Sequence, residues 1–388
     1  MKRLAVALLL TLTLPAAADD YILYAGSYTD APSTSKGISA WRFSADKGTL
    51  VPLGQVAETI NPAYVTATPD GKYLYAVNWQ TPDADKSADT VSAFAIDSKT
   101  GKLTFLNKAP AGGALPNEVL VAPGGKAVMV VDYGFTFKDH NVEQNNSGFT
   151  VLPILAGGKL GEPIYKDHHT GPALSPKQLN GAHTHGIAFS KDGKYVFVAE
   201  LGLDRVYTYN FDAAKPSATA FDPPYVNTNA GAGPRRLVLS PSGNFLYVNH
   251  ETDSKVSVFA VNGGHLKEIQ QISTLPPDFN GRNTTAEIAI SRDGKFVYVS
   301  NRGDDSVVVY SVDPARGTLT FRQRAPSLGK SPRNITIDPS GAYLFAANQN
   351  SNNITVFKRD PSSGQLTPFG PQLEMGQPAS MVFVKTPG

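Results

Sequence analysis

Four polar side chains between positions 185 and 302 are of the types that a ring-opening hydrolysis needs. They are His185, Arg235, Glu251 and Arg302. A neutral histidine can take a proton from water, and a nearby carboxylate can orient the histidine or share the proton. Arginine side chains can stabilise a carbonyl oxygen as it gains negative charge, and they can bind a carboxylate product. The combination suits the opening of a lactone ring, or the reverse reaction, if the fold brings the four residues together.

A repeated strand–turn–strand pattern supplies a framework that can do so. Six copies occur: TPDGKYLYAVN (68–78), APGGKAVMVVD (122–132), SKDGKYVFVAE (190–200), SPSGNFLYVNH (240–250), SRDGKFVYVSN (291–301) and DPSGAYLFAAN (338–348). The turn glycines are Gly71, Gly125, Gly193, Gly243, Gly294 and Gly341, which lie 47 to 68 residues apart. Each copy joins two apolar runs through a tight turn, as in a β-hairpin. Repeats of roughly this length that consist of strands are typical of a β-propeller.

A second pattern raises the number of blades to seven. Outer hairpins follow the copies, and an additional one, ISAWRFSADKGTL, begins at Ile38, before the first complete copy. The inner strands of this first blade come from both ends of the chain, because YILYAGSY (21–28) matches the second strand of the pattern and PASMVFV (378–384) matches the first. We therefore predict an all-β fold, a seven-bladed β-propeller in which the C-terminal strand joins blade one and leaves no open sheet edge.

Superposition of the repeats predicts where functional residues gather. Positions eight residues before the turn glycines hold Ala63, Asn117, His185, Arg235, Ala286 and Arg333; positions eight residues after them hold Trp79, Tyr133, Leu201, Glu251, Arg302 and Gln349, with Tyr28 equivalent in blade one. Both sets belong to one mouth of the central channel, because the first strand of an antiparallel hairpin starts where the second ends. We assign His185, Glu251, Arg235 and Arg302 as catalytic, and His183, Arg333, Trp79, Tyr133 and Gln349 as substrate-binding.

Each catalytic candidate also has a purely structural interpretation. His185 could be a hydrogen-bonded residue at a strand end, Glu251 could cap a loop, and Arg302 could bond neighbouring carbonyl groups. Arg235 is followed by Arg236, and either could form a salt bridge at the surface or between blades. Their coincidence at equivalent positions favours the functional interpretation. We expect Arg236 to matter less, because consecutive residues on a strand point to opposite faces.

A metal site is the main chemical alternative. His183 and His185 form an H-x-H pair on one face of a strand, and a third ligand could come from His168, His169 or Asp167. A catalytic zinc has three protein ligands, so the pair alone is a partial set. Four acidic residues of the channel could instead hold a cation through oxygen ligands; they are Asp132, Glu200, Glu118 and Glu287. We expect no metal ligand and no cofactor, and leave a divalent cation open.

The first 18 residues have the order of a secretory signal peptide. Lys2 and Arg3 precede an apolar run over 4–14, and Ala16 and Ala18 complete an A-x-A cleavage site. The run is shorter than the roughly 20 residues of a membrane-spanning helix. We predict a signal peptide over 1–18, a single propeller domain over 19–388, and a periplasmic location without membrane insertion.

Composition excludes several classes of chemistry and partner. The chain has no cysteine, so neither disulfides nor thiolate catalysis are available, and it has no G-x-S-x-G motif for a serine nucleophile. Its formal net charge is +2, from 35 basic and 33 acidic residues, and cleavage after Ala18 would bring it to zero. Nothing in this balance favours nucleic acid. We expect a small-molecule lactone as the partner, and the oligomeric state stays open.

Four long blocks resemble a known family of enzymes. GAHTHGIAFSKDGKYVFVAELGLDRVYTYNFD (181–212), GPRRLVLSPSGNFLYVNHETDSKVSVF (233–259), TAEIAISRDGKFVYVSNRGDDSVVVY (285–310) and SPRNITIDPSGAYLFAANQNSNNITVF (331–357) are similar to the lactonase family of seven-bladed propellers. That family includes bacterial 6-phosphogluconolactonase and fungal carboxy-cis,cis-muconate cyclase. The resemblance implies an active site of one His, two Arg and one Glu, which correspond to His185, Arg235, Arg302 and Glu251. The chain departs from the family at Arg236, where His is common, and in a long insertion over 134–180.

The predicted location then selects among substrates. A sugar phosphate lactone is made and used in the cytoplasm, whereas glucose oxidised outside the inner membrane gives unphosphorylated glucono-1,5-lactone. The resemblance and the signal peptide together imply a periplasmic gluconolactonase. The alternatives are a 6-phosphogluconolactonase, a muconate-type lactone cycloisomerase and a non-catalytic binding propeller.

Overall fold

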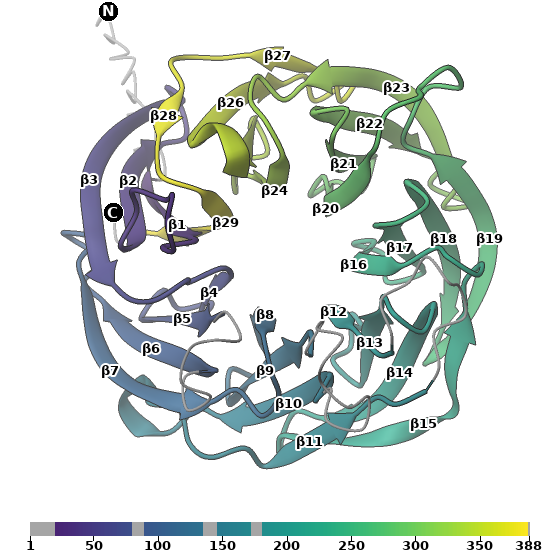
Figure 1. Ribbon diagram of the computed structural model, residues 1–388, viewed down its shortest axis with the longest axis horizontal. Coiled ribbons are helices and arrows are strands. Elements are labelled where there is room, and N and C mark those ends of the chain that lie inside the picture. Colours follow the sequence, from purple (N-terminus) through teal and green to yellow (C-terminus); the bar gives the residue numbers. More distant parts are fainter. Residues whose placement is uncertain (1–19, 80–88, 135–145, 172–180, 387–388) are drawn as a thin grey trace, which may run out of the picture.

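The computed structural model describes residues 20–79, 89–134, 146–171 and 181–386. Seven antiparallel sheets stand around a central channel (Figure 1). The innermost strand is the first of its blade in the sequence, except in blade one, where it is the last strand of the chain. Blade one consists of β29 (Pro378–Lys385), β1 (Asp20–Ser27), β2 (Gly37–Ser44) and β3 (Thr49–Glu58); blade two of β4 (Val65–Ala67), β5 (Tyr73–Asn78), β6 (Thr90–Ile96) and β7 (Leu103–Pro110); blade three of β8 (Pro116–Val121), β9 (Ala127–Asp132), β10 (Gly148–Pro153) and β11 (Tyr165–His168).

The remaining blades follow the same order. Blade four consists of β12 (Thr184–Phe189), β13 (Tyr195–Glu200), β14 (Arg205–Asp212) and β15 (Ser217–Asn227); blade five of β16 (Pro234–Leu239), β17 (Phe245–His250), β18 (Lys255–Asn262) and β19 (His265–Ser273); blade six of β20 (Thr284–Ile290), β21 (Phe296–Arg302), β22 (Ser306–Val312) and β23 (Leu319–Pro326); blade seven of β24 (Pro332–Ile337), β25 (Tyr343–Asn348), β26 (Asn353–Arg359) and β27 (Leu366–Pro368), with β28 (Leu373–Glu374) beside β26. Within the described ranges, two short 3₁₀ turns complete the elements, η3 (Ala156–Gly158) and η4 (Gln349–Ser351).

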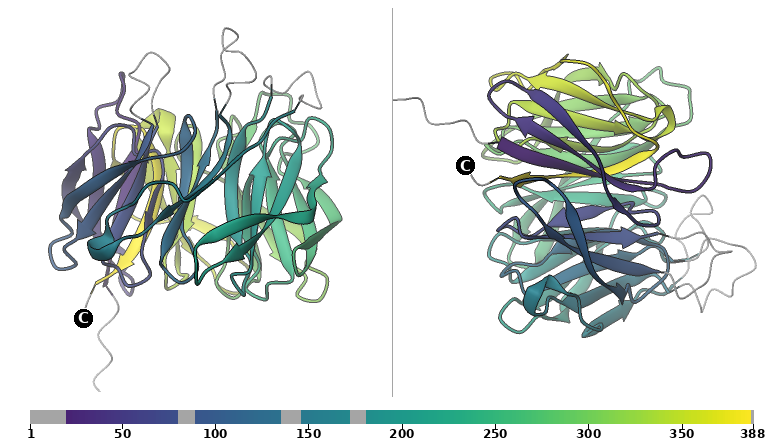
Figure 2. Two further views of the ribbon diagram at one scale, coloured as in Figure 1. Left: turned by 90° about the horizontal axis from the view of Figure 1, so that it is seen from below. Right: turned by 90° about the vertical axis from the view of Figure 1, so that its left-hand side faces the viewer.

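The ring closes as the sequence predicts. β29 pairs antiparallel with β1, with Tyr24 opposite Val382, so the last strand forms the inner edge of the first blade. Figure 2 shows the ring from its edge, with β29 lying against the first blade. Phe43 of blade one meets Phe345 of blade seven in a T-shaped contact with ring centroids 5.5 Å apart. Apolar packing therefore seals the closing interface as well as strand pairing, and the predicted seven-bladed fold is confirmed.

The inner hairpins turn sharply because of one recurring motif. In blade six the Ser291 hydroxyl accepts a hydrogen bond from the backbone N–H of Phe296 at 3.0 Å and donates one to Asp293 at 2.7 Å. Gly294 follows with a φ of 72°, a conformation that costs other residues energy. Ser190 makes the same contacts in blade four. The small polar residue and the glycine thus fix the turn at the mouth opposite the functional residues.

Buried tyrosines join neighbouring blades. Tyr24 of blade one donates its hydroxyl hydrogen bond to the carbonyl oxygen of Gly101 in blade two at 3.0 Å, and Tyr247 of blade five does the same to Gly317 of blade six. Because both tyrosines are fully buried, these bonds satisfy hydroxyl groups that would otherwise be costly inside the protein. The repeated tyrosine of the inner hairpin therefore sets the contact between blades.

A β-bulge interrupts the inner strands near the functional mouth. The pairing register slips at the start of β8, β12, β16 and β24, where the residues skipped are Asn117, His185, Arg235 and Arg333. A bulge leaves a residue outside the ladder and re-aims its side chain. Four positions that superposition of the repeats had grouped together thus share a backbone irregularity as well as a place in the fold.

The stretch 134–180 is only in part an insertion. It contains β10 and β11, which are the two outer strands of blade three and pair with each other from Gly148–His168 to Val151–Tyr165. Residues 135–145 and 172–180 lie outside the described residues. The prediction of one long insertion was therefore wrong for its middle part, which belongs to the regular propeller.

Candidate active site

A cavity of about 360 Å³ lies at the mouth where the bulges occur. Its lining includes eight of the nine residues that the sequence assigns to the site: His185, Arg235, Glu251, Arg302, Arg333, Trp79, Tyr133 and Gln349. It also includes Tyr28 and Asn117, which stood at equivalent repeat positions, and Asp30, Ala31 and Gln377, which were missed. The missed residues lie on connections beside β1 and β29, outside the repeated pattern, so superposition of the repeats gave no signal for them.

Glu251 is the centre of an ionic cluster within the cavity. Its Oε2 atom accepts a hydrogen bond from Arg235 Nε at 2.7 Å and lies 3.1 Å from Arg302 Nη2 and 3.9 Å from His185 Nε2. Burial opposes ionisation, but Arg302 and Arg235 outweigh it and lower the pKa of Glu251 to about 2. At neutral pH Glu251 is therefore a carboxylate held by two guanidinium groups, which is a weak proton acceptor.

His185 is a neutral imidazole at neutral pH. Burial, assisted by the positive charges of Arg235, Arg236 and Arg333, lowers the pKa of His185 well below its ordinary value of 6.5. The ring stands edge-on to Tyr133, with centroids 5.6 Å apart, and its Nδ1 atom has no hydrogen-bond partner among the described residues. A neutral imidazole whose Nε2 atom points towards a carboxylate is able to accept a proton from a water molecule.

The three arginines of the cavity have different partners. Arg235 donates through Nη1 to the carbonyl oxygen of Ala286, and Arg302 donates through Nη2 to that of Thr285 at 3.1 Å, in addition to their bonds with Glu251. Arg333 lies over the ring of Tyr28, with its guanidinium carbon 5.1 Å from the ring centroid, and has no ion-pair partner in the described part of the chain. The cavity therefore carries more positive than negative charge and is suited to an anionic group or a developing oxyanion.

Comparison with known proteins decides the family. The family described as "Lactonase, 7-bladed beta-propeller" matches residues 22–383. The chain belongs to this lactonase family. A 6-phosphogluconolactonase of Bacillus subtilis is 31% identical over 319 residues, which cover 81% of this chain and 84% of the relative. Membership makes the chain a lactone hydrolase that acts on a small-molecule lactone.

Solved structures agree with this assignment. The periplasmic gluconolactonase of Pseudomonas aeruginosa superimposes with a TM-score of 0.86 at 33% identity, covering 95% of the lactonase described here and 100% of the other chain. A putative 6-phosphogluconolactonase of Bacteroides fragilis gives a TM-score of 0.85 at 30% identity, with coverage of 96% and 99%. The two neighbours share the fold of this lactonase and carry names that differ in substrate.

His183, the ninth assigned residue, does not line the cavity. It is fully buried, its ring stacks on Tyr133 with centroids 4.6 Å apart, and its Nδ1 atom lies 2.9 Å from the Tyr133 carbonyl oxygen. The backbone N–H of His183 donates to Glu200. The lactonase thus uses His183 to support Tyr133 from behind, and the structure does not place it where a substrate in the cavity would touch it.

The residues considered as metal ligands are engaged elsewhere. His169 lies 2.8 Å from Glu200 and 2.7 Å from the Tyr209 hydroxyl, which in turn donates to Asp167. Glu118 and Glu287 both face Arg236. Across the described ranges, no group of three or more His, Asp or Glu side chains is arranged to hold a metal ion. His169 Nδ1 lies 3.2 Å from the hydroxyl of Thr184, between the two histidines of the H-x-H pair, but its ring nitrogens face Glu200 and Tyr209, and Glu118 and Glu287 face a guanidinium group.

Arg236 points to the other side of its strand from Arg235, as strand alternation predicts, and it does not line the cavity. Arg235, at the bulge, reaches towards blade six, whereas Arg236 reaches across the channel towards blades three and four. Both side chains are buried. Arg236 therefore lies behind the cavity lining, and the smaller importance expected of it stays a prediction.

The structure bears on the prediction about the membrane but not on the predicted signal peptide. In the residues that the structure describes, no helix is long and apolar enough to cross a membrane. The predicted signal peptide, residues 1–18, lies outside the described residues. The propeller begins with β1 at Asp20, close after the predicted cleavage position.

Proposed function

We propose that this lactonase hydrolyses an unphosphorylated aldonolactone, glucono-1,5-lactone to gluconate, in the periplasm. The observation that carries the proposal is a neutral His185 beside the ionised Glu251, with the arginines around them. The signal features of residues 1–18 support the location. The structural likeness to a periplasmic gluconolactonase, at 33% identity, supports both the substrate and the location.

The chemistry follows from the charge states. His185 accepts a proton from a water molecule as the water oxygen attacks the lactone carbonyl carbon. The carbonyl oxygen gains negative charge, which the guanidinium groups of Arg302 and Arg333 stabilise. When the bond between the carbonyl carbon and the ring oxygen breaks, the imidazolium of His185 returns the proton to the ring oxygen. The products are a hydroxyl group and a carboxylic acid, which releases its remaining proton to solvent at neutral pH and becomes the carboxylate.

Glu251 acts through its neighbours in this mechanism. With a pKa of about 2, it stays ionised throughout the physiological range and stabilises the imidazolium of His185, 3.9 Å away, once the proton has been transferred. It also holds the side chains of Arg235 and Arg302 in place. Of the two roles considered for Glu251 from the sequence, orientation of the histidine is thus favoured over proton sharing.

The rest of the cavity suits a polyhydroxylated ring. Tyr28 and Trp79 stand edge to face, with centroids 5.5 Å apart, and present aromatic carbon to the cavity. Asp30, Gln349 and Gln377 provide hydrogen-bonding groups for hydroxyls. A volume of about 360 Å³ is within the range of small-molecule sites and accommodates one sugar ring.

A phosphorylated lactone is the second candidate substrate, and Arg333 is the observation that favours it. This guanidinium lines the cavity and has no acidic partner among the residues described. An arginine of this kind can bind a phosphate group as well as a product carboxylate. The 6-phosphogluconolactonase of Bacillus subtilis, 31% identical, is consistent with this alternative.

A substrate panel tests the proposal. Purified protein is assayed in a pH-stat on glucono-1,5-lactone, its 6-phosphate and a muconolactone, with and without chelator, and every rate is corrected for spontaneous opening in buffer. We expect the highest kcat/KM on the unphosphorylated sugar lactone. A higher value on the 6-phosphate would assign the second candidate, and turnover of the muconolactone alone would assign the cycloisomerase reaction. Intact-mass analysis of a periplasmic extract tests the location, because the mature chain should begin at Asp19.

A further inference from the structure

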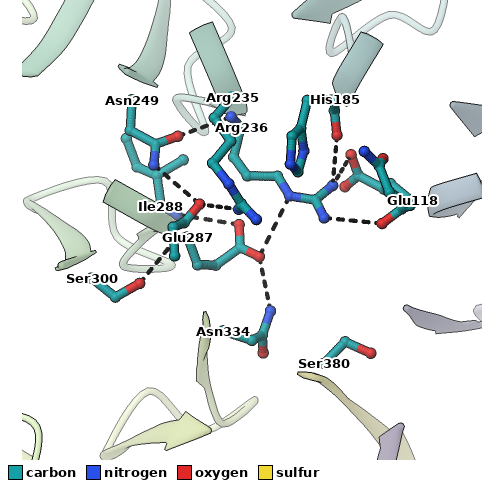
Figure 3. A network of polar contacts seen from close by, with 12 residues as sticks. Glu118, His185, Arg235, Arg236, Asn249, Glu287, Ile288, Ser300, Asn334 and Ser380 are labelled. Atoms are coloured by element: carbon teal, nitrogen blue, oxygen red, sulfur yellow. Dashed lines mark hydrogen bonds and ion pairs between the residues drawn. The ribbon is translucent and has the colours of Figure 1, made fainter. Parts of the chain in front are cut away.

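Arg236 occupies the channel one residue further from the mouth than Arg235. Only 5% of its surface is exposed. Its Nη1 atom donates to the carbonyl oxygen of His185 and its Nη2 atom to that of Asn117, each at 3.1 Å. Its guanidinium carbon lies 4.6 Å from the centroid of the Tyr64 ring. Figure 3 shows the side chain stretched across the channel towards blades three and four.

Two buried carboxylates share this guanidinium. Glu118 Oε2 contacts Arg236 Nη1 and accepts the backbone N–H of Ile187 at 2.9 Å. Glu287 Oε2 lies 3.9 Å from Arg236 Nε and accepts the amide of Asn334 at 2.8 Å. Burial disfavours the charged form of Arg236, but Glu118 and Glu287 outweigh it and raise its pKa above the usual value. Arg236 is therefore a permanent cation that ties together inner strands of several blades.

The two carbonyl groups that Arg236 binds belong to residues in β-bulges. Asn117 and His185 are the residues skipped in the registers of β8 and β12, and both side chains line the cavity. A bulged residue leaves the strand ladder, so its backbone groups need other partners. Arg236 supplies a donor to each carbonyl, and in doing so connects the backbone of the proposed base to the opposite side of the channel.

We propose that Arg236 is a positioning residue, which fixes the backbone of His185 and Asn117 so that the imidazole faces Glu251 at the reacting position. The inference rests on the proposed function, since it assigns a purpose to the placement of the base. Its basis is geometric: two donors from one guanidinium reach two bulged carbonyls, and two carboxylates hold that guanidinium in place.

A lysine cannot reproduce this arrangement. An ammonium group keeps the charge but lacks the planar fork that bonds two carbonyls and a carboxylate at once. A purely electrostatic or structural role would tolerate the change far better than a positioning role. We therefore expect Arg236→Lys to lower kcat roughly 10- to 100-fold, as small misplacements of a reacting group do, while KM stays within about threefold of wild type.

A neutral variant provides a second measurement. Charged and titratable groups face His185 from five elements: Arg235 and Arg236 on β16, Glu251 after β17, Arg302 on β21, Arg333 on β24 and Tyr133 after β9. Removal of the Arg236 charge removes one cation that keeps His185 neutral. Arg236→Met combined with Glu118→Gln and Glu287→Gln also removes two negative charges, so that no buried carboxylate is left unpaired and charge alone predicts no rise in the pKa of His185. Loss of the two donors to the bulged carbonyl groups should instead loosen the imidazole and let water reach it, which moves its NMR titration and the acidic limb of kcat/KM towards the ordinary value of 6.5.

The experiment compares these variants with a matched control. Arg359→Lys alters another buried arginine, which donates to the carbonyl oxygen of Gly341 at the opposite mouth. Melting curves and circular dichroism establish that each protein is folded. We expect full kcat in Arg359→Lys, reduced kcat in Arg236→Lys, and reduced kcat with a shifted His185 titration in the triple variant.

The outcomes separate the inference from the proposed function. Wild-type kcat in Arg236→Lys, or recovery of full kcat in the folded triple variant, would overturn the positioning role. If the wild-type protein hydrolyses no lactone in the panel, the proposed function fails. The NMR titration of His185 and crystal structures of the variants still test the position of the imidazole in that case, because neither needs a substrate, and an unmoved ring with an unshifted titration would overturn the inference.

Discussion

The two ends of the inner strands differ in how strictly they repeat. At the turn end, blades four and six use the same serine hydroxyl, aspartate and glycine to fix the hairpin. At the other end, the bulged position is asparagine in blade three, histidine in blade four and arginine in blades five and seven. The same backbone position thus carries three different residue types in four blades at one mouth, while blades four and six keep the same residues at the other.

This difference shows how a symmetric ring makes an asymmetric site. The turn end determines stability, because its residues serve the hairpins of which every blade is built. The bulged end leaves side chains outside the ladder, so it can change residue type with little effect on strand pairing. Changes at the turn end should therefore reduce stability and spare catalysis, and changes at the bulged end should do the opposite.

The largest effect on stability is expected from removal of β29, the strand that closes the ring. Truncation before Pro378 removes β29, the partner of β1, and opens the ring. The exposed edge of β1 and the uncovered aromatic cluster around Phe43 should cause loss of soluble protein or a strongly lowered Tm. Expression yield and thermal melting measure this, and a truncated chain as stable as the full one would show that the closure is dispensable.

The next largest effect, on the rate of hydrolysis, is expected from removal of the proposed base, His185. His185→Ala should lower the background-corrected rate on the best lactone by about 10²- to 10⁴-fold, the usual contribution of general acid–base catalysis. Its melting temperature should change little, because the bulged residue is outside the ladder. His265→Ala, on an exposed part of β19, is the control and should keep the wild-type rate. Near-normal rates in the His185 variant would refute the assignment of the base.

Substitutions in the ionic cluster around Glu251 should lower kcat by a somewhat smaller factor. Arg302→Ala removes a donor 3.1 Å from Glu251 and should lower kcat on the order of 10²- to 10³-fold, as loss of a group that stabilises developing charge does. Glu251→Gln should act in the same direction, because Arg235 and Arg302 then repel each other without a carboxylate between them. Steady-state kinetics on folded protein measure both. Unchanged kcat in either variant would separate the cluster from catalysis.

The turn end should respond in stability alone. Gly125 has a φ of 67° and open space around the position of a Cβ atom, so Gly125→Ala tests backbone strain without a steric clash. We expect it to lower the free energy of unfolding by about 1–2 kcal/mol, the cost of the left-handed conformation, with unchanged kcat. Gly125→Asn is the control and should cost less, since asparagine tolerates this conformation. A loss of kcat in the alanine variant would contradict the separation of the two ends.

The smallest effect is on pH dependence. Burial and the nearby arginines keep the pKa of His185 below 6.5 in the folded chain, whereas the unfolded chain has the ordinary value. As pH falls below about 6.5, the unfolded chain therefore binds a proton that the folded chain does not, so stability decreases towards lower pH. Because the base stays neutral, the acidic limb of kcat/KM should lie below pH 6.5. A midpoint at or above 6.5 would show that His185 is not the group that titrates.

Much of this architecture could be read from the sequence because it repeats. The turn glycines, the alternating strands and the split first blade have regular signals, and antiparallel geometry then places eight of the nine assigned residues at one cavity. What could not be read is local. The repeats gave no signal for the contacts of Arg236 with Glu118 and Glu287 inside the channel, nor for the stacking of His183 on Tyr133 outside the cavity lining. Asp30 and Gln377 lie on connections that have no counterpart in the other blades.

The pairing of the first and last strands also sets an order of events. The Thr386 hydroxyl bonds to the carbonyl oxygen of Asp20, a contact that spans 366 positions. Contacts of such separation in sequence form slowly, whereas the hairpins of single blades are local. A growing or translocating chain can therefore build blades early, but it cannot complete the cavity, because Tyr28 and Gln377 lie on either side of the last seam to form. Enzymatic activity is consequently a property of the finished chain, and its recovery during refolding reports the moment at which the ring shuts.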